Sequence, residues 1–296
     1  MATRLSTPDR PRGHDARFDA RECCSADGLR TYRVQVGVPE GEVPAAGYPA
    51  LFLLDGDLLA KPLADPLTAS GEPIVVVLIS HAPMGARARE ARAWDYTPAI
   101  AGRDPLADPR QPAWRNGGAD DFLALLGDMI VPAVLADHPI DRSRLTLYGH
   151  SYGALCVLRA VQTRRTPAFT RYVAASPSVW WHDGAILAQY AATRSPQHAD
   201  VLVMAGTLEA WHAQPVGSDG SPASREGGTP TLPVTYRLAR QWADSPDLNV
   251  VFEAIEGGTH HSMLAQSIPP AIAFARCTQA AIDAARLRPD LLETPS

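Results

Sequence analysis

The sequence predicts an α/β fold in which a mostly parallel central sheet is covered by helices on both faces. Short apolar runs rich in β-branched residues alternate along the chain with stretches whose apolar residues recur at helical spacing. The run at 74–79 is continuously apolar, as strands covered on both faces tend to be. Strands that alternate with helices in this way are typical of parallel sheets.

The expected elements follow one another in a regular order. We expect strands at 32–38, 50–54, 74–79, 145–148, 172–175, 201–205 and 250–255. We expect helices at 120–136, 154–161, 185–192, 236–242 and 263–285. Residues 81–119 show little periodicity and contain much proline, glycine, arginine and tryptophan, so the sequence predicts a long functional loop there.

The chain is expected to form one domain, residues 16–286, because α/β folds of this size often do. Residues 1–15 are rich in arginine, proline and aspartate and are expected to be a flexible N-terminal tail. Residues 213–230 are dense in glycine, serine and proline, which predicts a surface insertion. Residues 287–296 are expected to be a C-terminal tail.

The composition argues against several classes of partner. The net charge of −5 gives no reason to expect a nucleic acid. No stretch approaches the ~18 apolar residues that a membrane span needs, and the N-terminal residues contain no apolar signal-peptide core. The four cysteines form neither a disulfide framework nor a zinc-binding spacing. We therefore expect a cytoplasmic protein.

A candidate nucleophile lies in Gly149–Gly153, whose sequence GHSYG has the pattern G-x-S-x-G. The pattern alone is weak evidence, but here it lies between an expected strand and an expected helix, as a nucleophile elbow requires. Small flanking residues are expected because bulkier ones would collide with the neighbouring strand and helix. Ser151 is therefore the expected nucleophile of an α/β-hydrolase. The alternative is an ordinary strand-to-helix turn that happens to contain a serine.

A serine hydroxyl needs an adjacent base, which in this fold follows the last strand. The loop after 250–255 contains two histidines, His260 and His261. His260 is preferred because His261 is expected to begin the final helix.

The third member of a catalytic triad is a carboxylate that orients the imidazole, and it is expected after a strand that lies between the nucleophile and the base. Glu209 follows the strand at 201–205 and is preferred over Asp200 and Asp219. A surface carboxylate without a catalytic role is the alternative for Glu209.

Two backbone N–H groups should bind the oxyanion of the tetrahedral intermediate. The first is expected at Tyr152, directly after the nucleophile. The second is expected at Gly56 or Asp57, which follow an early strand and where glycine would let the backbone approach the substrate closely. An Asp-Gly pair is also a common turn former, so a plain turn is the alternative there. This serine-hydrolase chemistry needs no metal ion and no organic cofactor.

With these residues in place, the chain resembles the esterase branch of the α/β-hydrolases. Within that branch it is similar to the enterobactin-, salmochelin- and bacillibactin-type siderophore esterases. The landmarks that carry the resemblance are LLDGD at 53–57, Arg92 with DYTP at 95–98, YGHSYG at 148–153, SPSVWW at 176–181 and THHS at 259–262. They span residues 30–275, and SPSVWW is the most specific of them. Ala154 departs from the glycine usual at that position.

The resemblance implies an esterase that cuts the serine trilactone backbone of a catecholate siderophore, a small-molecule ester that can arrive as the ferric complex. Such a substrate is anionic and aromatic, so its site should offer arginines and flat rings. On this basis Arg92, Trp180, Trp181 and His150 are expected to bind the substrate, although either tryptophan could be core packing instead. A general carboxylesterase or acyltransferase on the same fold is the alternative, and a non-catalytic siderophore-binding protein is a more distant one.

Overall fold

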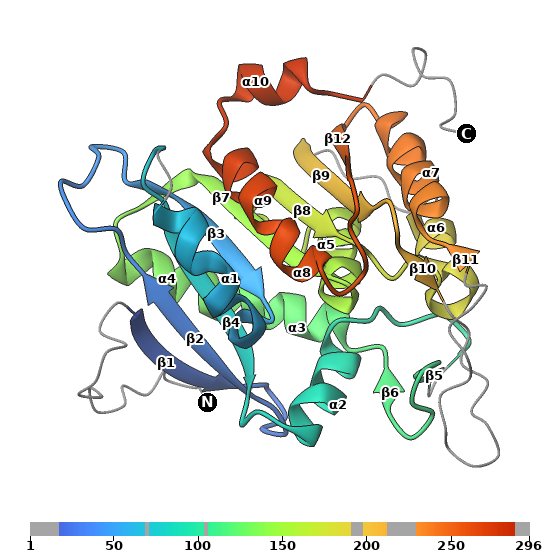
Figure 1. Cartoon of the computed structure of the whole chain (residues 1–296). Coiled ribbons are helices and arrows are strands. Elements are labelled where there is room, and N and C mark those ends of the chain that lie inside the picture. Colours follow the sequence, from blue (N-terminus) through green and yellow to red (C-terminus); the bar gives the residue numbers. More distant parts are fainter. Residues whose placement is uncertain (1–17, 69–70, 104–105, 191–197, 212–228, 288–296) are drawn as a thin grey trace.

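Eight strands of the computed structural model form one sheet in the order β1-β2-β4-β3-β7-β8-β9-β12 (Figure 1). The structure describes residues 18–68, 71–103, 106–190, 198–211 and 229–287. The strands of this sheet are β1 (Phe18–Cys24), β2 (Thr31–Gly37), β3 (Tyr48–Leu54), β4 (Val75–Ala82), β7 (Ile140–His150), β8 (Arg171–Ala175), β9 (Ala199–Gly206) and β12 (Leu248–Ile255). Strand β2 pairs antiparallel with β1 and β4, and every other pairing in the sheet is parallel.

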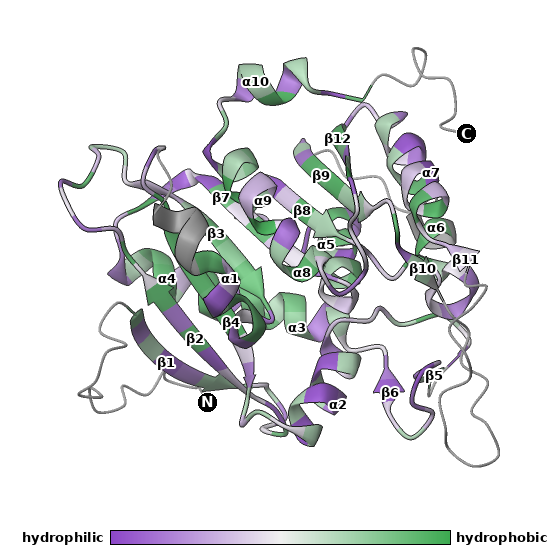
Figure 2. Ribbon diagram, in the orientation of Figure 1, coloured by the Kyte–Doolittle hydropathy of each residue, from purple (hydrophilic) through white to green (hydrophobic). Residues whose placement is uncertain are grey.

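Alternate residues of the central strands pack into two separate cores, because successive side chains of a strand point to opposite faces. In β3, Phe52 and Leu54 belong to one core, whereas Leu51 and Leu53 belong to the other. The central strands are accordingly green with apolar residues in Figure 2. Burial on both faces explains why the run at 74–79, most of which belongs to β4, is continuously apolar.

Helices cover both faces of the sheet, as Figure 1 shows. One face packs against α1 (Gly56–Thr68), α8 (Met263–Gln266), α9 (Ile268–Arg276) and α10 (Gln279–Ala284). The other packs against α2 (Ala86–Asp95), α3 (Ala119–Leu125), the π-helical segment η1 (Leu126–Ile130), α4 (Val131–Asp137), α5 (Tyr152–Thr163), α6 (Ala185–Tyr190) and α7 (Leu232–Ala243). A short 3-10 helix, η2, spans Trp181–Gly184. The predicted fold class, an α/β-hydrolase with a mostly parallel sheet, is confirmed.

The prediction of a long loop at 81–119 was wrong. The segment contains helix α2 and a small hairpin of β5 (Leu106–Ala107) and β6 (Arg115–Asn116), and α3 begins at its end. Helix α2 was missed because its sequence, ARAREARAWD, buries only Ala93 and Asp95 among its residues and so shows no apolar stripe. Strand β1 and helix α1 were also not predicted.

Most of the predicted tails and the insertion lie outside the described residues, so the division into domain, tails and insertion stays a prediction. Residues 1–15, 213–228 and 288–296 belong to that group. Where the chain of the insertion is described, β11 (Thr229–Pro230) pairs antiparallel with β10 (Ala210–Trp211). Across the described part of the chain, none of the helices is both long and apolar enough to cross a bilayer.

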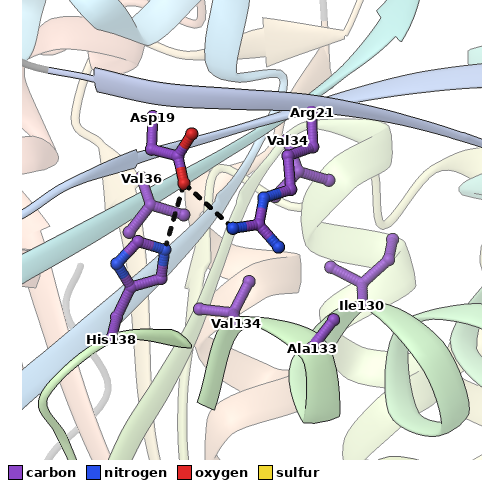
Figure 3. Close-up of a pocket in the computed structure, with 8 residues that line it drawn as sticks. All are labelled: Asp19, Arg21, Val34, Val36, Ile130, Ala133, Val134 and His138. Carbon is purple, nitrogen blue, oxygen red and sulfur yellow. Dashed lines mark hydrogen bonds and ion pairs between the residues drawn. The ribbon is translucent and has the colours of Figure 1, made fainter. Parts of the chain in front are cut away.

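A small cavity lies between β1, β2 and the η1–α4 segment (Figure 3). It is lined by apolar side chains of these elements together with Asp19, Arg21 and His138, and Asp19 contacts both of the other two. Its volume of about 20 Å³ admits about one water molecule. Strand β1 lies four positions from β7 in the sheet, which is about 19 Å. The cavity is therefore neither large enough nor close enough to β7 to serve as the site predicted there.

Candidate active site

Three non-glycine residues with positive φ follow three strands at the carboxyl edge of the sheet. Asp55 (φ 60°) follows β3, Ser151 (φ 59°) follows β7 and Ser176 (φ 47°) follows β8, and all three are buried. The strands are consecutive in the sheet, so the three residues lie along one stretch of its edge. Each such conformation costs of order 1–3 kcal/mol and clusters at functional sites. The backbone strain thus marks this part of the edge as a candidate site.

Ser151 lies in a sharp turn between β7 and α5. A side-chain carbon at Gly149 would meet the carbonyl oxygen of Gly153 at 2.2 Å, so Gly149 must be glycine. A carbon at Gly153 would make only ordinary contacts, the nearest at 3.4 Å to Asp55 Oδ2. The predicted steric reason for glycine therefore holds at Gly149, whereas nothing comparable requires it at Gly153.

The structure brings Ser151, His260 and Glu209 into one hydrogen-bonded chain. Ser151 Oγ is 3.0 Å from His260 Nε2, and His260 Nδ1 is 3.1 Å from Glu209 Oε2. An ionised carboxylate only accepts hydrogen bonds, so in a neutral imidazole the Nδ1 atom carries the proton and Nε2 accepts from the serine. Ser151 and Glu209 are buried, whereas the His260 side chain is 43% exposed. This is the geometry that a serine nucleophile, a base and an orienting acid require.

Glu209 is held by donors on three sides. Its Oε1 accepts hydrogen bonds from Ser176 Oγ and from the Gly206 backbone N–H, and its Oε2 accepts from His260. Burial alone would raise the pKa of Glu209, but these hydrogen bonds outweigh burial and leave that pKa below its ordinary value. Glu209 is therefore ionised at neutral pH, as a residue that stabilises an imidazolium must be.

The loop that carries Glu209 and the loop that carries His260 pack directly against each other. A side-chain carbon at Gly206 would lie 2.2 Å from the carbonyl oxygen of Gly258, so the two backbones meet here without side chains between them. The Leu208 N–H donates to the Gly258 carbonyl, and the Gly257 N–H donates to Thr207 Oγ1. These contacts fix the distance between the acid and the base.

The alternatives to Glu209 and His260 are placed differently. Asp200 lies at the opposite end of β9, where it accepts hydrogen bonds from Asn249 and Gln279. Asp219 lies outside the described residues. His261 is exposed, and its backbone carbonyl accepts a hydrogen bond from the Leu264 N–H.

The N-termini of two helices meet beside Ser151. Tyr152 opens α5 after β7 and Gly56 opens α1 after β3, and these strands are parallel neighbours. The first N–H groups of a helix have no intrahelical acceptor and carry partial positive charge, so the N–H groups of Tyr152, Gly56 and Asp57 are suited to an oxyanion. A side-chain carbon at Gly56 would lie 2.5 Å from Leu78 Cβ. Close packing on β4 therefore already requires glycine here, and the predicted close approach of the backbone to a substrate stays a prediction.

Arg92 joins the two helix N-termini. Its Nε and Nη2 atoms donate to the two Asp55 oxygens, each at 2.6 Å, and Nη2 also donates to the His150 carbonyl at 3.2 Å. The bidentate geometry fixes Asp55 as well as neutralising it. Since these contacts occupy two of its three nitrogens, Arg92 is seen here to hold the loop after β3 against the nucleophile elbow. Its predicted contact with substrate stays a prediction.

Comparison with known proteins identifies the family to which this chain belongs. The model of the Esterase family matches residues 25–221, a stretch that contains Ser151 and Glu209 and ends before His260. The chain belongs to this esterase family. The apo-salmochelin esterase of Escherichia coli O6:H1 is 36% identical over 183 residues, which cover 61% of this chain and 57% of that protein. The ferri-bacillibactin esterase BesA of Bacillus subtilis is 28% identical over 262 residues, covering 77% of this chain and 90% of that protein.

Solved structures agree with the family. The enterobactin hydrolase IroE in complex with DFP is 29% identical and superposes with a TM-score of 0.65, covering 87% of this chain and 94% of that chain. The BES protein from Bacillus cereus has a TM-score of 0.73 over 92% of this chain and 100% of that chain, and its 22% identity supports the fold alone.

In this esterase-family protein, the segment Ser176–Trp181, which carried the resemblance most specifically, contacts both Glu209 and Ser151. Ser176 Oγ donates to Glu209, and the Oγ atom of Ser178, which is fully buried, lies 3.1 Å from Ser151 Oγ. With Ser151 donating to a neutral His260, Ser178 is the donor in that contact. These two roles were not predicted, since SPSVWW matches no general hydrolase rule. Only the three-dimensional structure reveals that the side chain of Ser176 contacts Glu209 and that of Ser178 contacts Ser151.

The two neighbouring tryptophans of the same segment differ in position. Trp181 is fully buried, and its indole N–H donates to Asn116 Oδ1 at 2.9 Å, so this side chain offers no surface to a substrate here. Trp180 is half-buried, and its ring centroid lies 6.1 Å from that of Tyr152. Of the two tryptophans, Trp180 is the one positioned to contact a substrate.

His150 lies against the backbone of His260 and is not exposed to an open site. It is buried, and its Nε2 lies 3.0 Å from the His260 carbonyl oxygen, to which it donates. Burial lowers the pKa of His150 to about 3, with the neighbouring His260 and Arg92 acting in the same direction. His150 is therefore neutral near pH 7 and holds the loop of His260. Its predicted contact with substrate stays a prediction.

Acid should destabilise this protein partly through His150. Between pH ~6.5 and ~3, His150 is protonated in the unfolded chain but stays neutral in the folded protein. The free energy of unfolding therefore falls as the pH falls, by up to ~1.4 kcal/mol per pH unit. We expect His150→Gln to reduce this slope in urea denaturation measured across that range. The exposed His261→Gln should keep the wild-type slope. Equal slopes in all three proteins would contradict the prediction.

Proposed function

We propose that this protein is a serine esterase that hydrolyses ester bonds through an acyl-enzyme formed on Ser151. The observation that carries the proposal is the chain of contacts from Ser151 Oγ to His260 Nε2 at 3.0 Å and from His260 Nδ1 to Glu209 Oε2 at 3.1 Å. An elbow serine with positive φ and two helix N-termini beside it supply the other parts of that chemistry.

In the acylation half of the proposed reaction, Ser151 Oγ attacks the ester carbonyl carbon while His260 Nε2 takes its proton. Negative charge moves to the carbonyl oxygen, where the N–H groups of Tyr152 and of Gly56 or Asp57 stabilise it. Glu209 stabilises the imidazolium. When the tetrahedral intermediate collapses, the C–O bond to the alcohol breaks and His260 gives the alcohol its proton.

In the second half, water replaces the alcohol. His260 takes a proton from the water as its oxygen attacks the acyl carbon, and the same N–H groups hold the second oxyanion. The bond to Ser151 Oγ then breaks, and Oγ recovers its proton from His260. One water is consumed for each ester, and the products are a carboxylic acid and an alcohol.

We propose the trilactone backbone of a catecholate siderophore as the substrate. The names of the relatives support this choice, since they are esterases of salmochelin, bacillibactin and enterobactin. The partly exposed Trp180 and the guanidinium of Arg110, 4.0 Å from the Tyr152 ring centroid, fit an anionic aromatic compound.

Product analysis by mass spectrometry tests the substrate. Enterobactin is incubated with the protein in its iron-free and ferric forms, and 4-nitrophenyl acetate is assayed in parallel. We expect linear products that carry one added water per ester cut. An intact trilactone beside rapid turnover of 4-nitrophenyl acetate would instead indicate a general carboxylesterase, and tight trilactone binding without any product would indicate a binding protein. An added alcohol that appears in a new ester would indicate an acyltransferase.

A further inference from the structure

The hairpin of β5 and β6 stands outside the main sheet (Figure 1) and is anchored by one buried carboxylate. Asp108 is 1% exposed. Its Oδ1 accepts the backbone N–H groups of Arg110 and Gln111 at 2.9 and 3.0 Å, and its Oδ2 accepts Tyr152 Oη–H at 2.9 Å and Asn116 Nδ2–H at 3.1 Å. A buried charge is tolerated when its oxygens are satisfied in this way.

Asn116, a residue of β6, connects the hairpin to α2 and to the segment after β8. Its amide nitrogen donates to the Ala93 carbonyl at 3.0 Å, and its amide oxygen accepts the Trp181 indole N–H at 2.9 Å. Burial raises the pKa of Tyr152, so its phenol remains a neutral donor to Asp108. The tip of the hairpin is therefore tied to α2, to α5 and to the segment after β8, and its position is fixed before any ligand binds.

This anchoring places one cationic side chain over the ring of Tyr152, the residue after Ser151. The Arg110 guanidinium carbon lies 4.0 Å from the ring centroid of Tyr152 and 5.7 Å from that of Trp180. Arg110 is exposed, and within the described part of the chain it forms no ion pair. Arg92 also lies near the Tyr152 ring, at 5.9 Å, but its guanidinium is paired with Asp55. Of these two cations, Arg110 is the exposed one and the one without a carboxylate partner among the described residues.

Both aromatic partners of Arg110 adjoin the reaction centre. Tyr152 directly follows Ser151, and Trp180 lies two residues after Ser178, whose Oγ is 3.1 Å from Ser151 Oγ. We propose that Arg110 and Trp180 form the subsite for an aromatic, negatively charged acyl group of the ester, and that Arg110 determines specificity for that charge. The inference rests on the proposed esterase function and names the residues that select the substrate.

The chemistry of the subsite follows from the stacking. A guanidinium that lies on a ring keeps its N–H edge free, and that edge can donate to a carboxylate or to a phenolate oxygen. Trp180 offers an aromatic surface to the ring of the acyl group. Because the Asp108 anchor already fixes the hairpin, little conformational entropy is lost when the ligand binds.

Two matched esters test the proposal. 4-Nitrophenyl benzoate and mono-4-nitrophenyl terephthalate share a leaving group and a ring and differ by one carboxylate. For Arg110→Gln, we expect the ratio of kcat/KM, charged ester over neutral ester, to fall about tenfold, chiefly through KM. The same ratio for Arg110→Lys should lie between those of the wild type and Arg110→Gln, because lysine keeps the positive charge but lacks the planar guanidinium. The Asp108 contact uses the Arg110 backbone, so it survives both substitutions.

Arg115→Gln is the matched control, because Arg115 lies in the same hairpin, is exposed and carries the same charge. It should keep the wild-type ratio. An unchanged ratio in Arg110→Gln, or an equal fall in both variants, would overturn the proposal.

Calorimetry separates the subsite from the esterase function. In a Ser151→Ala background, adding Arg110→Gln should weaken binding of 2,3-dihydroxybenzoate at least about fivefold. Equal affinities, or no binding in the Ser151→Ala protein, would refute the subsite whether or not the enzyme turns over esters. Absence of ester turnover in the wild type beside Arg110-dependent binding would refute the esterase function and support the subsite.

Discussion

Ser151→Ala is expected to lower kcat on any ester substrate by about 10⁶-fold, because the variant has no nucleophile to form the acyl-enzyme. The fold should persist, since the change removes one hydroxyl whose partners are His260 and Ser178. Alanine keeps the positive φ of Ser151, which any residue other than glycine must strain to adopt. Steady-state kinetics, with circular dichroism as a check of folding, measure both outcomes.

Ser178→Ala is the matched control for that experiment. It also removes a buried hydroxyl, 3.1 Å from the first, but leaves the contact between Ser151 and His260 in place. It should remain far more active than Ser151→Ala. A fluorophosphonate probe should modify Ser151 in the wild type, as mass spectrometry of the labelled peptide would show. Labelling of a different serine, or a fully active Ser151→Ala protein, would refute Ser151 as nucleophile.

His260→Ala should lower kcat/KM by about 10⁵- to 10⁶-fold near neutral pH, because Ser151 then has no base at hydrogen-bond distance. Glu209 would lose its imidazole partner but keep the hydrogen bonds from Ser176 and Gly206, so the fold should tolerate the change. Residual turnover should increase with hydroxide concentration, since solvent would then supply the base. The measurement is kcat/KM for one ester over a series of buffers.

The neighbouring histidine provides the control. His261 is exposed, and His261→Ala should change kcat/KM by less than about threefold. Loss of activity in His261→Ala together with activity in His260→Ala would reverse the assignment of the base. The two histidines are consecutive in the chain, so this pair of variants also tests whether the loop presents the side chain of His260, and not that of His261, to Ser151.

Much of the fold could be predicted because its signals are local. Strands buried on both faces tend to be continuously apolar, as residues 75–79 of β4 are, and α5 shows helical spacing directly after a G-x-S-x-G turn. The order of Ser151, Glu209 and His260 along the chain was predicted from the fold, and the structure places His260 within hydrogen-bond distance of both Ser151 and Glu209.

Other features could not be predicted because they depend on distant partners. Helix α2 buries little, so its sequence shows no stripe, although Arg92 and Asp95 each contact residues far along the chain. Asp108 resembles any surface carboxylate in the sequence, and its burial depends on Tyr152, which is 44 residues away. Arg92 was recognised from the family pattern, but that pattern does not reveal that its guanidinium is paired with Asp55.

The close contact between Gly206 and Gly258 has a consequence for thermal motion. Where Gly206 meets Gly258 no side chain separates the two backbones, and the Thr207 hydroxyl and the Leu208 N–H add hydrogen bonds between the two loops, so Glu209 and His260 should move together. Ser151 lies on other elements, at the turn between β7 and α5. Transient opening would then separate the hydroxyl from the imidazole while the imidazole and the carboxylate stayed together, so a partly opened molecule would still contain a correctly oriented base.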